Sequence, residues 1–233
     1  MDLQNAIVWS DEAIIAVNKP AGLLTIRDGY DASLPYLAGM LEANFGQVWT
    51  VHRLDKETSG IILFARSAEA HRALNQQFKQ RETKKYYHAI VIGAPEWQTI
   101  TIALPLFTNG DRKHRTIIDH QRGKTATTQV DVIRTAGGFA LLNASPRTGY
   151  THQIRAHLAA VGLPLLADPL YKSLKPVTRL QEIAYERSNT LPIQRVALHA
   201  SRLSFCHPLS GQTVTFEAPY PVDFARTVDI LFS

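Results

Sequence analysis

A short polar segment, V-H-R-L-D-K-E-T-S-G at residues 51–60, gathers the side chains of this sequence that are best suited to chemistry. It holds the carboxylates Asp55 and Glu57, with Arg53 and Lys56 beside them, just before an apolar run that predicts a strand. Loops at strand ends often carry function, and a carboxylate there could act as a nucleophile or a base. The spacing alone nevertheless favours a solvated turn in which Asp55 caps the backbone that follows it.

A second candidate is Arg155, in a segment that predicts a helix capped by Thr151 and ended by Gly162. At helical spacing one face of this segment is apolar, with Ile154, Leu158 and Val161. Arg155 falls on the opposite face, so it is free to point at a site instead of into the core. The residues alone indicate an ordinary surface arginine.

A basic stretch spans residues 109–124 between strand-like segments, which predicts a protruding hairpin or loop. Its cations are Arg112, Lys113, Arg115, Arg122 and Lys124, against two aspartates. Such residues could neutralise phosphates of a nucleic acid, but a solvated charged loop explains the charge count equally well.

The elements that must position these residues are mostly strands. Strand-like runs are Ile14–Val17, Ile61–Ala65, Tyr86–Ile92, Thr128–Ile133, Phe139–Ala144, Val196–Phe205 and Thr213–Phe216. Ser67 is a candidate cap for a helix that ends near Arg81. The pattern predicts an α+β fold on a mixed, largely antiparallel β-sheet flanked by helices and loops. No linker separates domains, so residues 1–233 are expected to form a single domain.

Composition sets further bounds. The chain has 233 residues and a net charge of +5, which permits a polyanionic partner without proving one. A single cysteine, Cys206, excludes an internal disulfide. The acidic N-terminus does not resemble a signal peptide and no apolar run reaches membrane-spanning length, so we expect a cytoplasmic protein. His152 and His157 are five residues apart, which does not suit a metal site on one helical face.

Several motifs together resemble one family. H-R-L-D-K-E-T-S-G is similar to the signature of the RluA family of RNA pseudouridine synthases. The family's other elements resemble N-K-P-A-G at 18–22, K-Y-Y-H-A-I-V-I-G at 85–93, R-T-G-Y-T-H-Q-I-R-A-H-L at 147–158, R-V-A-L-H-A at 195–200 and F-C-H-P at 205–208. They occur in the order that the family has, over nearly the whole chain.

The resemblance implies a catalytic domain of the pseudouridine synthase fold, without the S4 domain that some members carry. It makes Asp55 the catalytic aspartate, Tyr87 the active-site tyrosine that stacks on the base, and Arg155 the arginine that pairs with the aspartate. Arg53 would hold the flipped-out RNA conformation, and the basic stretch would grip an RNA stem. The expected partner is a stem-loop of ribosomal or transfer RNA, bound by a monomer with neither cofactor nor metal.

Two departures and two alternatives accompany this interpretation. Tyr150 stands where the family usually has Arg or Lys, and Ala167 where it usually has Gly. A nucleoside or glycoside hydrolase would need a second carboxylate, for which Glu57 and Asp168 are the candidates, and would release free uracil. A non-catalytic RNA-binding module would not need the aspartate, the tyrosine and the helix arginine together.

Overall fold

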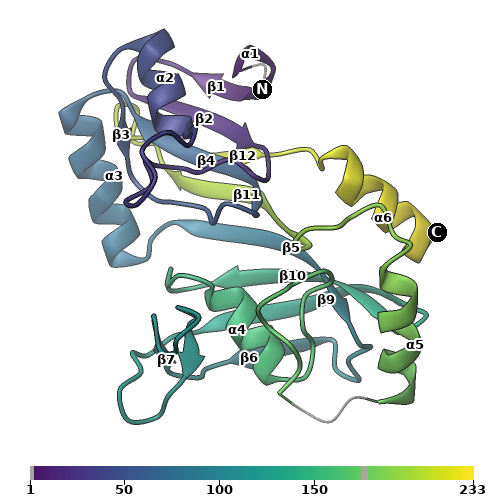
Figure 1. Cartoon of the computed structure of the whole chain (residues 1–233). Coiled ribbons are helices and arrows are strands. Elements are labelled where there is room, and N and C mark those ends of the chain that lie inside the picture. Colours follow the sequence, from purple (N-terminus) through teal and green to yellow (C-terminus); the bar gives the residue numbers. More distant parts are fainter. Residues whose placement is uncertain (1–2, 175–177) are drawn as a thin grey trace. The chain divides into compact units, whose positions relative to one another are not determined.

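The structure, a computed structural model, describes residues 3–174 and 178–233. Its internal contacts group into two compact units, one made of residues 1–85 and 199–220 and the other of residues 86–198 and 221–233. Each unit contains β-strands flanked by helices (Figure 1). The organisation as one catalytic domain stays a prediction.

The first unit is built on strands in the order β1-β2-β4-β11, with β3 added to β4 and β12 to β11. The strands are β1 (Ile7–Ser10), β2 (Ile14–Lys19), β3 (Trp49–Thr50), β4 (Ser59–Ala65), β11 (Leu198–Cys206) and β12 (Thr213–Glu217). The pairs are antiparallel except β4 with β11, which is parallel where Ser59 lies opposite His199. The sheet is therefore mixed and mostly antiparallel.

The middle of this sheet is buried on both faces. Every residue of β4 is buried, so the strand reads as a continuous apolar run instead of alternating. The helices of the unit are α1 (Leu3–Ala6), α2 (Leu37–Phe45) and α3 (Ala68–Gln80). Helix α3 packs on β4, and the Ser67 side chain accepts a hydrogen bond from the Ala70 N–H, which confirms Ser67 as its cap.

The second unit has an antiparallel sheet in the order β5-β10-β9-β6. These strands are β5 (Lys84–Ile92), β6 (Thr99–Ile102), β9 (Thr128–Ala136) and β10 (Phe139–Pro146). A separate small hairpin pairs β7 (Leu106–Phe107) with β8 (Ile117–Ile118). The helices are α4 (Gln153–Ala160), α5 (Arg179–Ser188) and α6 (Val222–Phe232).

Helix α4 covers the sheet of the second unit and closes its core. Ile154 and Leu158 of α4 pack with Ala89 and Val91 of β5 and with Leu142 of β10. This core fixes the position of α4 relative to β5, the two elements that carry Arg155 and Tyr87.

The fold class is confirmed as α+β on a mixed, mostly antiparallel sheet, and each of the seven strand-like runs lies in or overlaps an observed strand. In the part of the chain that the structure describes, no helix is both long and apolar enough to cross a membrane.

Candidate active site

The loop that carries Asp55 is held by residues from the N-terminal motif. The Thr25 hydroxyl donates to the Leu54 carbonyl at 2.9 Å and accepts from the Leu54 N–H at 3.2 Å. The ammonium of Lys19, which is fully buried, donates to the carbonyls of Pro20, Leu23 and Lys56. A buried ammonium needs such acceptors. Thr25 thus holds the backbone before Asp55, at Leu54, and Lys19 holds the backbone after it, at Lys56.

His52 fixes the start of the same loop against β4. Its Nε2 accepts a hydrogen bond from the Leu63 N–H at 3.1 Å, and its ring stacks on Phe78. Burial, helped by the positive charge of Lys85, lowers the pKa of His52 to about 3. The imidazole therefore stays neutral, as an acceptor at Nε2 must.

The Thr-Ser-Gly end of the motif is also structural. His199 Nε2 donates to the Ala218 carbonyl at 3.0 Å, so its Nδ1 accepts from the Ser59 hydroxyl at 3.0 Å. Gly60 has φ +115°, and a Cβ there would lie 2.2 Å from the backbone oxygen of Ala200. Only glycine fits so close to the neighbouring strand.

Asp55 itself is half-buried at the turn of this fixed loop, and Arg53 and Lys56 are exposed. The turn is closed by the main-chain carbonyl of Asp55, which accepts the Thr58 N–H at 3.1 Å. This bond uses main-chain atoms only, and the capping role of the Asp55 side chain that the spacing alone favoured stays a prediction.

In the second unit, Tyr87 lies on β5 opposite Ala144 of β10. Its ring is half-buried and packs against the apolar core beneath the sheet. The sheet thus fixes the ring on one side.

Helix α4 begins one residue later than the sequence predicted. Thr151 is not its cap, because the N-cap residue is His152, which has a left-handed backbone and no side-chain capping bond. Gln153 ties down this end instead: its side chain accepts from the Thr148 hydroxyl and the Tyr150 N–H and donates to Thr127 and Thr128.

His157 continues the same network inside α4. Its Nε2 donates to the Leu104 carbonyl and its Nδ1 accepts from the Thr128 hydroxyl, with distances of 3.0 and 2.9 Å. Burial lowers the pKa of His157, although the bond to the carbonyl acts in the opposite direction. These two bonds tie α4 to the first residue of β9 and to the segment before β7.

Arg155 is a buried residue, contrary to the surface position inferred from helix periodicity. It is 4% exposed, and all residues from Gln153 to Ala159 are buried. Its Nε and Nη2 donate to the two carboxylate oxygens of Asp168 at 2.7 and 2.8 Å. The pair explains how a helix buried on every side tolerates an arginine.

Asp168 is the residue of this site that sequence reasoning undervalued. Its side chain is completely buried, and its Oδ1 also accepts the backbone N–H groups of Leu170 and Tyr171. Its importance follows only once the burial of Arg155 is known, because a buried arginine requires a carboxylate partner. Its engagement with Arg155 makes it unsuited to be the second carboxylate of a hydrolase.

The two departures from the family pattern lie near this ion pair. Ala167 has φ +56°, a left-handed conformation in which glycine is preferred. Tyr150 is half-buried and packs on an apolar cluster that includes Ala156, Ala159 and Tyr171. Tyr150 thus packs on apolar side chains at a position where the family usually has a charged Arg or Lys.

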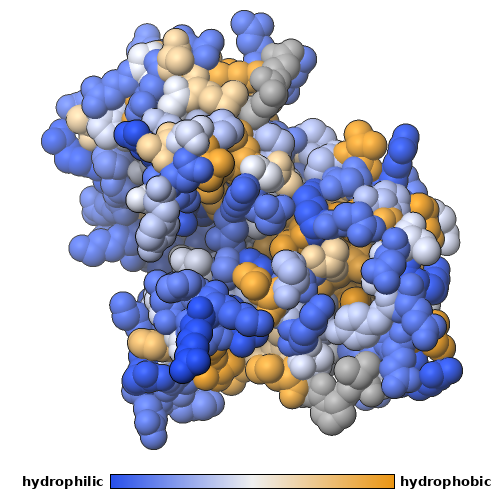
Figure 2. Space-filling view, viewed as in Figure 1, coloured by the Kyte–Doolittle hydropathy of each residue, from blue (hydrophilic) through white to orange (hydrophobic). Residues whose placement is uncertain are grey.

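The basic stretch forms the predicted hairpin, around β7 and β8. Hydrophilic side chains cover this region at the lower left of Figure 2. Arg112, Lys113 and Lys124 are exposed. The other two cations are engaged within the hairpin: Arg115 pairs with Asp111 at 2.6 Å and Arg122 pairs with Asp119 at 2.8 Å.

The structure thus places Asp55 and Arg53 in the first unit and groups Arg155 and Asp168 in the second unit, where Tyr87 also lies. The pairing of Arg155 with Asp55 stays a prediction. Among residues 3–174 and 178–233, no three His, Cys, Asp or Glu side chains are grouped to hold a metal ion.

Comparisons with known proteins agree on one family. The profile described as RNA pseudouridylate synthase matches residues 13–160. Ribosomal large subunit pseudouridine synthase D of Zymomonas mobilis is 36% identical over 231 residues, covering 95% of this chain and 71% of that protein. Dual-specificity RNA pseudouridine synthase RluA of Haemophilus influenzae is 35% identical over 213 residues, covering 91% of each.

Solved structures show the same fold. The human protein titled RNA Pseudouridylate Synthase Domain Containing 4 superposes with a TM-score of 0.76 at 21% identity, covering 97% of this chain and 93% of that one. RNA Pseudouridylate Synthase Domain Containing 1, also human, gives a TM-score of 0.73 at 26% identity, covering 93% and 83%.

Proposed function

Since the chain belongs to the RNA pseudouridylate synthase family, and is thus an isomerase that converts uridine in RNA to pseudouridine, we propose that Asp55 is the carboxylate that carries the reaction. The substrates proposed are specific uridines in stem-loops of ribosomal RNA, transfer RNA or both. One relative is named for the ribosomal large subunit and another for dual specificity, which supports this choice.

The observation that carries the proposal is the construction of the Asp55 loop. Lys19, Thr25 and His52 fix its backbone through buried and partly buried hydrogen bonds, and the turn at Asp55 closes through main-chain atoms. The backbone that carries the Asp55 carboxylate is therefore held in one position by the fold. Preorganisation of this kind is what a catalytic carboxylate requires.

The reaction breaks the N-glycosidic bond of uridine, turns the base over and rejoins it through carbon 5. A base stacked in a helix is out of reach, so the target uridine is flipped into the site. Asp55 then acts as nucleophile or base. The isomerisation is internal and redox-neutral, so no oxidant or reductant is needed.

Tyr87 and Arg155 have supporting roles in this proposal. The Tyr87 ring, backed by the core of the second unit, stacks on the flipped base. Arg155 pairs with Asp55 and keeps it ionised, because an adjacent guanidinium favours the charged form of a carboxylate. Its Nε and Nη2 bond the two carboxylate oxygens of Asp168, which fixes the orientation of the guanidinium. Arg53 is exposed and holds the flipped-out RNA.

The basic hairpin is the proposed grip on the RNA stem. Arg112, Lys113 and Lys124 are exposed and suited to phosphate contacts, which fix register without reading sequence. Arg115 and Arg122 are ion-paired with Asp111 and Asp119, which holds the hairpin loops together, and they are proposed as further RNA contacts. The protein is proposed to act as a monomer in the cytoplasm.

Incubation with unmodified ribosomal and transfer RNA tests the function. Pseudouridine is mapped by a chemical stop in primer extension, and free uracil is measured in the same reaction. We expect one or a few new pseudouridines and no uracil. Release of uracil would identify a hydrolase, and binding without any modification would identify an RNA-binding module.

A further inference from the structure

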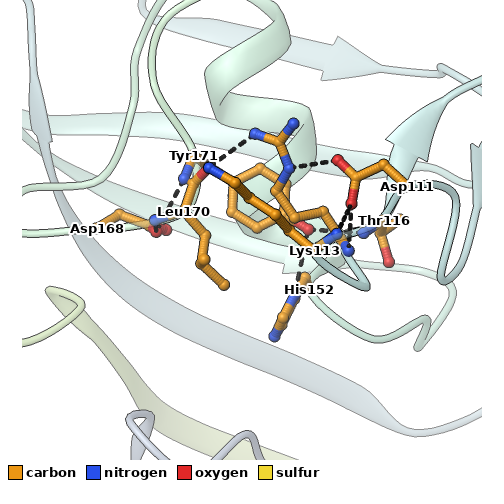
Figure 3. Close-up of polar contacts among 8 residues, drawn as sticks. Asp111, Lys113, Thr116, His152, Asp168, Leu170 and Tyr171 are labelled. Atoms are coloured by element: carbon orange, nitrogen blue, oxygen red, sulfur yellow. Dashed lines mark hydrogen bonds and ion pairs between the residues drawn. The ribbon is translucent and has the colours of Figure 1, made fainter.

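Tyr171 is a buried tyrosine that contacts the hairpin, the start of α4 and the Arg155–Asp168 pair in the second unit. It is 6% exposed and uses its ring, hydroxyl and backbone in separate contacts (Figure 3). The hydroxyl accepts the Thr116 N–H at 2.8 Å and bonds His152 Nδ1 at 3.1 Å. The backbone N–H donates to Asp168 at 3.1 Å.

The first consequence concerns Arg155. The centre of its guanidinium lies 4.9 Å from the centroid of the Tyr171 ring, while its edge is bonded to Asp168. A cation placed over an aromatic face is attracted to it, and the fork of a bidentate pair fixes the plane. Tyr171 therefore restrains Arg155 directly through its ring and indirectly through the Asp168 carboxylate that it helps to orient.

The second consequence concerns the basic hairpin. Thr116 directly precedes β8, and its backbone N–H ends on the Tyr171 hydroxyl. Its own hydroxyl donates to the Thr151 carbonyl at 2.6 Å, at the approach to α4. Arg115 donates to the Leu170 carbonyl at 2.9 Å, one residue before Tyr171. The base of the hairpin is thus anchored on the same short segment that holds Arg155.

We infer that Tyr171 is a positioning residue that joins the RNA-gripping hairpin to Arg155, so that both are held in one rigid arrangement. This inference rests on the proposed roles of the hairpin and of Arg155. Burial raises the pKa of Tyr171 to about 12, so the hydroxyl stays protonated. It accepts a hydrogen bond from the hairpin at Thr116 and shares one with His152 at the start of α4.

The variant Tyr171→Phe tests the part that concerns Arg155. It keeps the ring over the guanidinium but leaves the buried Thr116 N–H without its acceptor, which loosens the segment. The single-turnover rate at saturating RNA should fall roughly tenfold, and the acid limb of the pH–rate profile should move upward. Tyr185→Phe removes the hydroxyl of a half-buried tyrosine elsewhere in the second unit, and this control should keep the wild-type rate.

A second variant guards against loss of folding. Asn tolerates the left-handed backbone at residue 152 (φ 56°), and in His152→Asn the shorter side chain breaks the bond to the Tyr171 hydroxyl. Its rate should fall in the same direction. Rates within twofold of wild type in every variant that retains its fold, as judged by circular dichroism, overturn the role toward Arg155.

The connection between Tyr171 and the basic hairpin is tested by measuring RNA affinity, without any measurement of activity. Arg112→Ser with Lys113→Ser is introduced into wild type and into Tyr171→Phe, and RNA affinity is measured by filter retention. If Tyr171 holds the hairpin in register, the double substitution should cost at least roughly threefold less affinity in the Tyr171→Phe background. Equal losses overturn the connection. This cycle needs no catalysis, whereas failure of the proposed function appears as absence of pseudouridine with wild type.

Discussion

The ion pair between Arg155 and Asp168 gives a prediction whose size follows from the structure. The two side chains are 5% and 0% exposed. In Arg155→Ala the Asp168 carboxylate stays buried, and the backbone N–H groups of Leu170 and Tyr171 are the donors that still bond it. An uncompensated buried charge costs about 3–5 kcal/mol. That is a large part of the ~5–15 kcal/mol by which a domain is typically stable.

A double-mutant cycle separates the pair from other effects of truncation. Urea denaturation is followed for wild type, Arg155→Ala, Asp168→Ala and the double variant. The double variant should lose less free energy of unfolding than the sum of the single variants, because neither charge is then left alone. The matched control is the bidentate pair of Arg195 with Asp223, whose side chains are 12% and 32% exposed. Arg195→Ala should cost distinctly less than Arg155→Ala.

The same variants report on activity. Arg155→Ala should lower the single-turnover rate far more than the RNA affinity and move the acid limb of the pH–rate profile upward. Arg155→Lys should not rescue fully, since an ammonium cannot reproduce the planar fork. A cost in stability below about 1 kcal/mol, the level of an exposed pair, would refute the buried pair. Equal losses of binding and activity would make Arg155 a phosphate contact.

Three further predictions concern backbone strain, acid stability and RNA binding. Ala167→Gly should raise the free energy of unfolding by about 0.5–1 kcal/mol in urea titrations, since φ is +56° there, and a loss would contradict the strain. Burial lowers the pKa of His52 to about 3 in the folded protein, below the value of about 6.5 expected in the unfolded chain. The contribution of His52 to the free energy of unfolding is therefore complete above pH ~6.5 and is lost as the pH falls toward 3. His52→Phe should flatten this acid-side slope, and an unchanged slope would assign it to other groups. Replacing Arg112, Lys113 and Lys124 by serine should weaken RNA binding and lower the slope of log affinity against log salt by up to ~0.7–0.9 per lost phosphate contact. The rate at which RNA already bound is converted to pseudouridine should change little. An unchanged slope would place the RNA elsewhere.

The strands were predictable because their residues are apolar in the right lengths. The run Ser59–Ala65 is buried throughout, and its flanking polar motif marks where it starts. Helix α3 was predictable from Ser67 and its amphipathic spacing. Helix α2 was not, since its cap residue Tyr36 gives no capping side chain and no pattern marks its start. Strands β7 and β8 are only two residues long, too short for any periodicity to register.

The candidate site shows the same division between local and non-local information. The motif around Asp55 could be found from neighbouring residues alone. The burial of Arg155 could not, because helix periodicity assumes that a charged residue faces solvent, whereas here Asp168 from a following loop neutralises it. The strain at Ala167 was signalled by the glycine that the family usually has, but its size depends on the backbone angle.

The central claim is that the Asp55 carboxylate performs the isomerisation, and one measurement tests it most directly. Wild type and Asp55→Asn are incubated with the same unmodified RNA, pseudouridine is mapped by primer extension, and affinity is measured by filter retention. Asparagine keeps the size of the side chain but removes its charge. The variant should bind RNA as well as wild type or slightly better, because a negative charge near the RNA backbone is gone, and it should form no pseudouridine. Pseudouridine formation near the wild-type level by Asp55→Asn would contradict the claim.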